Sequence, residues 1–183
     1  MNQCKTGIFA LSLSTLFLTQ TVNAEALLNP KPFSVGIGSY ALVVSADDSD
    51  YDDDDFSGFQ VNASYAFSDN FAGKLTYYSL EHDDWSDLEN SGFDLVGYFG
   101  TGLLNDGFKA YVGGGVYRET WEIGGFDFDE TFSGFQLNGG IGYHWPAVTL
   151  DLTLGLRSTG DYEDFAGIDA TAVTSSLSIG YRF

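Results

Sequence analysis

The chain has 183 residues, of which 26 are Asp or Glu and seven are Lys or Arg, giving a formal net charge of −19. Proteins that bind nucleic acids neutralise phosphates with Lys and Arg, so this balance argues against a nucleic-acid partner. The length fits one domain, and the high content of Gly, Phe and Tyr favours closely packed strands over a helical bundle.

The N-terminus has the pattern of a secretory signal peptide. Lys5 precedes an apolar stretch from Ile8 to Leu18, and the small residues up to Ala24 offer a cleavage site before Glu25. An N-terminal anchor helix is the alternative, but the stretch is shorter than the about 20 apolar residues that span a membrane. We therefore expect residues 1–24 to be removed and residues 25–183 to form one domain, which contains no cysteine.

Eight later segments show strand patterns, joined by connections of alternating length. The predicted strands are 33–45, 56–67, 71–82, 91–103, 108–121, 131–145, 148–159 and 169–183. The connections after the second, fourth and sixth strands are tight turns, whereas the others are longer and acidic. Short connections on one side and long ones on the other are typical of an up-and-down barrel in the outer membrane, with the turns in the periplasm.

The last predicted strand shows the alternation most clearly. Val173, Leu177 and Ile179 share one face, while Ser178 and Arg182 share the other. A water-soluble sandwich has the same period with its apolar face inside. Because the polar faces of these strands carry mostly small residues and few charges, they fit a narrow lumen better than a solvated surface. The predicted fold class is therefore an all-β, eight-stranded antiparallel transmembrane barrel.

These features resemble the small outer-membrane β-barrel proteins of Gram-negative bacteria, the OmpA/OmpX-like superfamily. The resemblance covers residues 25–183, and its most specific element is the final strand ending in Tyr181 and Phe183. It implies that this strand is the signal read by the outer-membrane insertion machinery. It also implies an outer-membrane location with extracellular loops and periplasmic termini, and contact with outer-membrane lipid and lipopolysaccharide. We expect a monomer.

The acidic residues concentrate in the four long connections. The first of these connections holds the densest run, made of Asp47, Asp48, Asp50, Asp52, Asp53, Asp54 and Asp55. Carboxylates at the cell surface would lie beside anionic lipopolysaccharide, and Ca²⁺ or Mg²⁺ is the natural bridge between them. The run lacks the Gly and the distant Glu of the helix–loop–helix calcium motif. Weak divalent-cation binding and plain solvation of these loops are both consistent with the sequence.

The predicted lumen is narrow and contains charged residues. Inward-facing candidates are Lys74, Asp94, Asp151, Arg157 and Arg182, together with Gln60, Asn62, Gln136 and Asn138. An eight-stranded barrel is just wide enough for side chains to fill. Buried charges persist only when they are paired, so we interpret these residues as an ion-pair and hydrogen-bond network that plugs the barrel.

A seven-residue repeat and two groups of aromatic residues complete the pattern. Residues 56–62 recur as residues 132–138, which suggests two four-strand halves, although chance similarity between two strands is the alternative. Two interfacial aromatic belts are expected. The periplasmic belt would contain Phe67, Phe71, Phe99, Phe108, Tyr143, Trp145, Tyr181 and Phe183, and the outer belt Phe56, Phe59, Phe93, Trp121, Phe132 and Phe135.

The sequence offers little support for catalysis or a cofactor. Its two histidines are His82, which is interpreted as a solvated loop residue among acids, and His144, which is interpreted as a lumen or interface residue. A structural or surface-interaction role through the acidic loops is therefore the favoured hypothesis. A small-solute porin-like channel is the alternative, followed by an enzyme that modifies lipid A.

Overall fold

The strands are long and consecutive in the chain. The computed structural model describes residues 30–46, 54–84, 87–124, 129–166 and 170–183. The strands are β1 (Phe33–Ala46), β2 (Asp54–Ala66), β3 (Phe71–His82), β4 (Leu88–Thr101), β5 (Gly107–Ile123), β6 (Asp129–His144), β7 (Val148–Arg157) and β8 (Ala170–Arg182), and the helix α1 (Gly160–Ala166) precedes β8. None of the described helices is long and apolar enough to cross a membrane.

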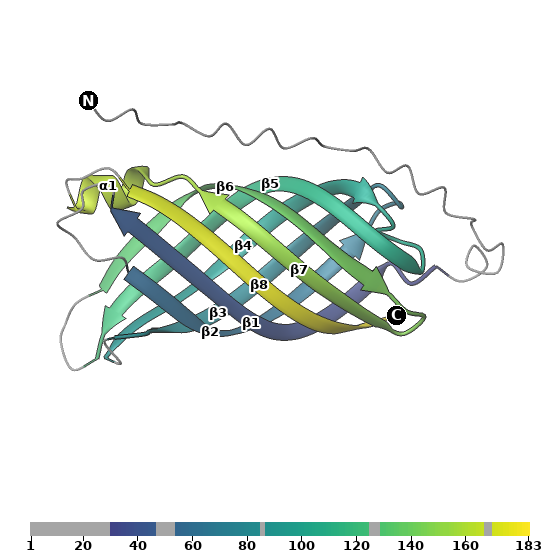
Figure 1. The fold of residues 1–183 in the computed structure, drawn as a ribbon, viewed down its shortest axis with the longest axis horizontal. Coiled ribbons are helices and arrows are strands. Elements are labelled where there is room, and N and C mark those ends of the chain that lie inside the picture. Colours follow the sequence, from purple (N-terminus) through teal and green to yellow (C-terminus); the bar gives the residue numbers. More distant parts are fainter. Residues whose placement is uncertain (1–29, 47–53, 85–86, 125–128, 167–169) are drawn as a thin grey trace, which may run out of the picture.

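The eight strands form one closed antiparallel barrel (Figure 1). Each strand pairs with its neighbours in sequence, and β1 closes the sheet by pairing with β8 from Ser34 opposite Arg182 to Ala46 opposite Ala170. The predicted fold class and the order of strands are therefore confirmed. Closure leaves no unpaired edge, which a strand surrounded by hydrocarbon requires.

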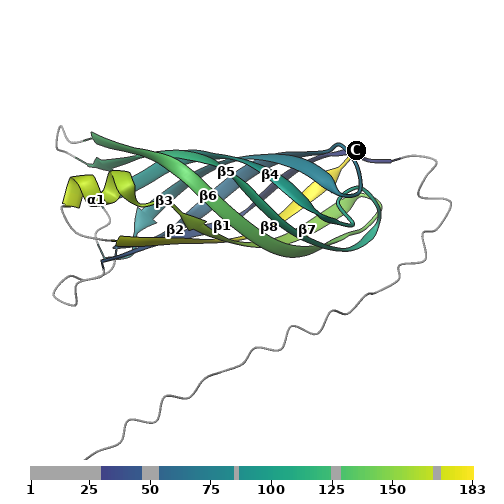
Figure 2. The same ribbon diagram turned by 90° about the horizontal axis from the view of Figure 1, so that it is seen from above.

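The two ends of the barrel differ in their connections. The loop end carries the connections after β1, β3, β5 and β7, and α1 lies there (Figures 1 and 2). The turn end carries the tight turns after β2, β4 and β6 and the C-terminal Phe183. The β4–β5 turn contains Gly102, whose φ of 72° is a left-handed conformation that favours glycine.

The alternation along the strands separates an apolar outer face from a polar lumen. In β8, Val173, Leu177 and Ile179 are exposed, whereas Ser178 and Arg182 are buried. In β4 and β5 the buried face is mixed, because Val96, Tyr98, Tyr111 and Tyr117 point inward together with the charged Asp94, Lys109 and Glu119.

Three aromatic residues expected in the outer belt lie in the lumen instead. Phe56, Trp121 and Phe132 are buried, while their predicted companions Phe59 and Phe135 are exposed on the outer face. The reason is the strand period of two: Phe56 and Phe132 have the same phase as the buried Gln60 and Gln136, so they point inward. All members of the predicted periplasmic belt are exposed.

The repeated segment occupies equivalent places on opposite sides of the barrel. β2 and β6 are four strands apart in a ring of eight. The rings of Phe56 and Phe132 both pack against Trp121, with centroids 4.7 and 5.1 Å from it. The repeat therefore places an aromatic ring and an amide side chain in the lumen from each of the two strands. These are Phe56 and Gln60 in β2, and Phe132 and Gln136 in β6.

Candidate functional site

The lumen at the loop end is organised around one arginine. The Arg157 guanidinium donates to Glu119 Oε2 at 2.5 Å and to Asp94 Oδ1 at 2.8 Å. The same guanidinium donates to the hydroxyl oxygens of Tyr40 and Tyr78, both at 3.0 Å. We call these five residues the loop-end cluster. One cation held by two carboxylates and two hydroxyls satisfies the pairing that a buried charge needs.

Aromatic rings enclose the loop-end cluster. The rings of Tyr40 and Tyr78 stack with centroids 4.6 Å apart. The guanidinium carbon of Arg157 lies 4.3 Å from the centroid of the Tyr117 ring, within the range of a cation–π contact. The fully buried Leu42 occupies the same apolar core. The side chains of Arg157 and Glu119 have no exposed area, and such a low-dielectric surrounding strengthens each electrostatic contact.

The helix α1 covers the loop end and places Tyr162 against the cluster. The Tyr162 hydroxyl donates a short hydrogen bond to Glu119 Oε1, which also accepts from Trp121 Nε1 at 3.0 Å. The ring of Tyr162 packs on Phe132 with centroids 4.7 Å apart. Burial, and then the negative charge of Glu119, raise the pKa of Tyr162 well above its ordinary value. Sequence reasoning did not predict this helix, because its acidic residues resembled an open loop.

The middle of the lumen is lined by amides and hydroxyls. Gln60 Nε2 donates to the carbonyl of Ser39 at 3.1 Å. Among the described residues, the Oε1 atoms of Gln60 and Gln136 have no hydrogen-bond partner. A cavity of about 10 Å³ lies at this level, which is room for about one water molecule. The middle of the barrel is therefore nearly filled by side chains.

A second charged group lies toward the turn end. Lys109 Nζ contacts Asp151 Oδ1 at 2.7 Å, donates to Thr149 Oγ1 at 2.8 Å and lies 2.7 Å from His144 Nε2. His144 Nδ1 lies 3.2 Å from the carbonyl oxygen of Asn105, which can only accept. This contact assigns the ring proton to Nδ1 and leaves Nε2 to accept from the lysine. We call Lys109, Asp151, His144 and Thr149 the turn-end cluster.

The β4–β5 turn folds into the barrel and closes the turn end. Leu103 is buried against Val96, Tyr98 and Tyr111. The Asp69 carboxylate, from the β2–β3 turn, accepts from three backbone N–H groups of this turn at 3.2–3.4 Å and from the side chain of Asn105 at 2.9 Å. The two turns therefore hold each other in place.

Arg182 joins the last strand to the same turn. Its guanidinium donates to Asp106 Oδ1 at 2.6 Å, to the carbonyl of Leu104 at 2.6 Å and to the carbonyl of Trp145 at 2.8 Å. Tyr181 and Phe183 point outward beside it, and β1 closes on Phe183 through two backbone hydrogen bonds with Phe33 of 2.9 and 3.2 Å.

The structure separates the five predicted lumen charges into two regions. It brings Asp94 and Arg157 together in the loop-end cluster, and places Asp151, Lys74 and Arg182 toward the turn end. The network also uses residues that sequence reasoning missed, namely Tyr40, Tyr78, Lys109 and Glu119. The phase of β5 could have identified Lys109 and Glu119. Both are at odd-numbered positions, as are the inward-facing Tyr111 and Tyr117, so all four lie on the same face of the strand.

The acidic run after β1 falls mainly outside the described residues. Asp47, Asp48, Asp50, Asp52 and Asp53 are not described. Asp54 and Asp55 begin β2, and Asp54 Oδ1 lies 3.3 Å from His82 Nε2. Within the part of the chain that the structure describes, no group of three His, Cys, Asp or Glu residues could hold a metal ion.

His82 is not the solvated loop residue that its acidic neighbours suggested. Its ring is buried and lies edge-on to Phe56, with centroids 5.0 Å apart. Its Nδ1 accepts from the backbone N–H of Asp84 at 3.1 Å. Because Nδ1 accepts, Nε2 carries the proton and points to Asp54, so these contacts anchor the start of the connection after β3.

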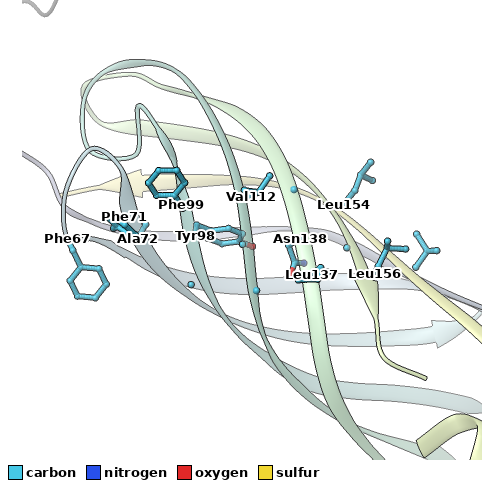
Figure 3. A pocket seen from close by; sticks show the side chains of 16 residues that line it. Phe67, Phe71, Ala72, Tyr98, Phe99, Val112, Leu137, Asn138, Leu154 and Leu156 are labelled. Atoms are coloured by element: carbon cyan, nitrogen blue, oxygen red, sulfur yellow. The ribbon is translucent and has the colours of Figure 1, made fainter. Parts of the chain in front are cut away.

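A wide apolar hollow lies on the outer face of the barrel. It is an apolar groove of about 1080 Å³ toward the turn end, bordered by Phe67, Phe71, Phe99 and Leu137 (Figure 3). Three outward-facing glycines form its floor at Gly97, Gly114 and Gly139, where an added Cβ would meet no atom closer than 3.6 Å. The groove is part of the apolar exterior and is separate from the charged lumen.

Comparisons with known proteins agree with this architecture. Residues 9–183 match the family model described as outer membrane protein beta-barrel domain. No curated protein sequence matches the chain. Ail, the attachment invasion locus protein of Yersinia pestis, is similar in structure at 18% identity and a TM-score of 0.58, covering 84% of this chain and 99% of Ail.

Two further solved structures are similar at low sequence identity. Neisserial surface protein A matches at 15% identity and a TM-score of 0.63, covering 85% of this chain and 99% of its own. OprG from Pseudomonas aeruginosa matches at 15% identity and a TM-score of 0.54, covering 85% of this chain and 97% of its own. These likenesses show the shared fold. The chain belongs to the family of outer-membrane β-barrel proteins.

Proposed function

We propose that this protein is a closed outer-membrane barrel that acts through the acidic surface at its loop end. The observation that carries the proposal is the filled lumen. Ion pairs, aromatic rings and the β4–β5 turn occupy it, α1 covers its loop end, and two cavities within it measure about 40 and 10 Å³. Because a filled barrel of eight strands has no wide path for solutes, we assign its function to the surfaces exposed at its ends.

The loop end is densely acidic in the part that the structure describes. Its exposed carboxylates are Asp55, Glu81, Asp83, Asp84, Asp87, Glu89, Glu122, Asp129, Glu130 and Asp161. In the proposed orientation the loops face outward and the termini face the periplasm, so these groups lie beside lipopolysaccharide. Divalent cations such as Ca²⁺ and Mg²⁺ take oxygen ligands from both carboxylates and phosphates. We propose weak, distributed cation bridging, to which Asp47–Asp55 contribute, without catalysis or a bound cofactor.

Binding to lipopolysaccharide tests this function. The purified protein in phospholipid vesicles should retain lipopolysaccharide in the presence of Mg²⁺ or Ca²⁺ and lose it with Na⁺ at the same ionic strength. Replacing Glu122, Asp129 and Glu130 by their amides should weaken retention several-fold, whereas Thr101→Ser at the turn end should not. Equal retention by the wild type and the triple variant would contradict the role of the acidic end.

Single-channel conductance separates this function from that of a small-solute channel. The filled lumen predicts no steady openings in a planar bilayer. Steady openings with a conductance that fits a pore wide enough for a hydrated small solute would favour the channel.

We also propose that residues 1–24 are a cleaved signal peptide and that Tyr181 and Phe183 are read by the insertion machinery. Both aromatic residues are exposed on the outer face, although Arg182 between them is buried. Phe183→Ser should lower the fraction of the monomeric protein that reaches the outer membrane, while Ser178→Thr in the same strand should not. Equal insertion of the Phe183→Ser variant would overturn this role.

A further inference from the structure

The turn-end cavity gathers most of the positive charge of a strongly acidic protein. Four of the chain's seven Lys and Arg residues line it, namely Lys31, Lys74, Lys109 and Arg182. Asp151 is the one carboxylate among the lining residues. The loop-end cluster has the opposite balance, with two carboxylates for one arginine. Because Asp151 pairs with Lys109 and Asp106 pairs with Arg182, the excess positive charge around this cavity comes from Lys31 and Lys74.

Lys74 faces this cavity without a direct counter-ion. Among the described residues no carboxylate lies within 4.0 Å of its ammonium, although the charges of Asp151 and Asp94 act on it from farther away. Both of these carboxylates already hold closer partners, Lys109 and Arg157. Lys74 is half-buried, and an ammonium that is partly withdrawn from water is costly unless it is paired or hydrogen-bonded.

A second unused donor points to the same place. Asn62 is 7% exposed and lines the cavity, and its Nδ2 has no hydrogen-bond partner in the described part of the chain. Ser64 lies two residues away on the same face of β2 and directly opposite Lys74 in the register. Its hydroxyl shares a hydrogen bond of 2.7 Å with Ser34, and either oxygen can be the donor.

We propose that this cavity binds a small inorganic anion such as chloride, held by Lys74, Asn62 and Ser64. The volume of about 40 Å³ accepts an ion close to a water molecule in size and excludes large organic anions. An ammonium, an amide N–H and a hydroxyl are all donors, so they would leave a cation or a neutral apolar ligand poorly satisfied. This proposal does not depend on the proposed function of the loop end.

Bromide provides a direct probe of the site. Crystals of the wild-type protein grown or soaked in bromide should show an anomalous peak between Lys74 and Asn62. In lipid vesicles, replacing gluconate by chloride at constant ionic strength should lower the unfolding equilibrium constant by about tenfold or more at a saturating chloride concentration, because the ion binds only the folded state. Lys74→Met should abolish this dependence, and Arg118→Gln, on the outer face, should preserve it.

Asn62→Asp keeps the test decisive if Lys74→Met fails to fold. The new carboxylate would take the place of the anion beside Lys74, so this variant should fold without chloride and show no chloride dependence. A wild-type protein with no bromide peak in the cavity and no difference between chloride and gluconate would overturn the proposal. So would a chloride dependence that both the Lys74 and the Asn62 variants retain.

Discussion

The two halves of the lumen solve the same problem of buried charge in different ways. At the loop end, Arg157 is surrounded by Asp94, Glu119 and two tyrosine hydroxyls inside a shell of aromatic rings. At the turn end, Lys109 pairs with Asp151, while Lys74 faces a cavity without a direct partner. One fold therefore holds a cation paired with two carboxylates at one end and a lysine without a direct counter-ion at the other.

Arg157→Met gives the largest effect expected from this difference. It leaves two carboxylates buried without their cation, and breaking such a pair costs about 3–5 kcal/mol of unfolding free energy. Urea titration in lipid vesicles measures the loss. Arg118→Met, at an exposed position near the same end, is the matched control and should change stability much less. Adding Asp94→Asn and Glu119→Gln to Arg157→Met should restore part of the loss, and a triple variant as unstable as the single one would contradict this explanation.

Leu103→Ala tests how firmly the turn end is closed. Leu103 inserts between Val96, Tyr98 and Tyr111, and shortening a buried leucine costs about 2–5 kcal/mol, the lower part of that range applying where the surroundings can relax. We expect about 2–3 kcal/mol in urea titrations, because the turn can move toward the adjacent cavity. Leu104→Ala, in the same turn but only half-buried, should lose less. An equal loss for both would mean that burial of Leu103 does not hold the β4–β5 turn inside the barrel.

The sequence was sufficient for the barrel because the strand period and the alternating connections are local signals. It also placed Asp94, Asp151 and Arg157 on the inner face, since each follows from the phase of its own strand. The partners could not be predicted in the same way. Arg157 and Tyr40 lie 117 positions apart in the chain, and their contact depends on strand tilt and register around the closed ring. The helix α1 was missed because tertiary packing of Tyr162, rather than local propensity, accounts for its position.

Lys109→Met and Lys74→Met compare a paired and an unpaired lysine in the same half of the lumen. Loss of Lys109 removes the 2.7 Å contact from Asp151, whose side chain is 13% exposed. Because water can partly solvate the abandoned carboxylate, we expect a loss of about 2 kcal/mol, below the range for fully buried pairs. Lys74→Met should change stability by less than about 1 kcal/mol in gluconate, since it leaves no directly paired group behind.

Urea titrations of both lysine variants, with Lys31→Met as a control at the same end, measure this comparison. If Lys74→Met were as damaging as Lys109→Met, the division between a paired and an unpaired lysine would be wrong. If adding Asp151→Asn to Lys109→Met restored part of the unfolding free energy, this would confirm that the unpaired carboxylate of Asp151 causes the loss.

Tyr162→Phe has the smallest expected effect and probes the link between α1 and the loop-end cluster. It removes one hydroxyl donor from Glu119, while Trp121, Tyr78 and Arg157 remain bonded to that carboxylate. The loss at neutral pH should therefore be about 1–2 kcal/mol in urea titrations. Phe132→Leu keeps the hydrogen bond but changes the ring that packs on both Tyr162 and Trp121, so it separates loss of the donor from loss of packing.

The pH dependence of this difference identifies the hydroxyl as its source. Because the pKa of Tyr162 is raised in the folded protein, its contribution is fully present below the unfolded value of about 10. Above that pH the unfolded chain releases the proton first, so the contribution declines by about 1.4 kcal/mol per pH unit until the folded group also ionises. The stability advantage of the wild type over Tyr162→Phe should accordingly shrink between pH 9 and pH 11, about one unit on either side of that value. A constant advantage across this range would show that ionisation of the Tyr162 hydroxyl does not contribute to the difference between the two proteins.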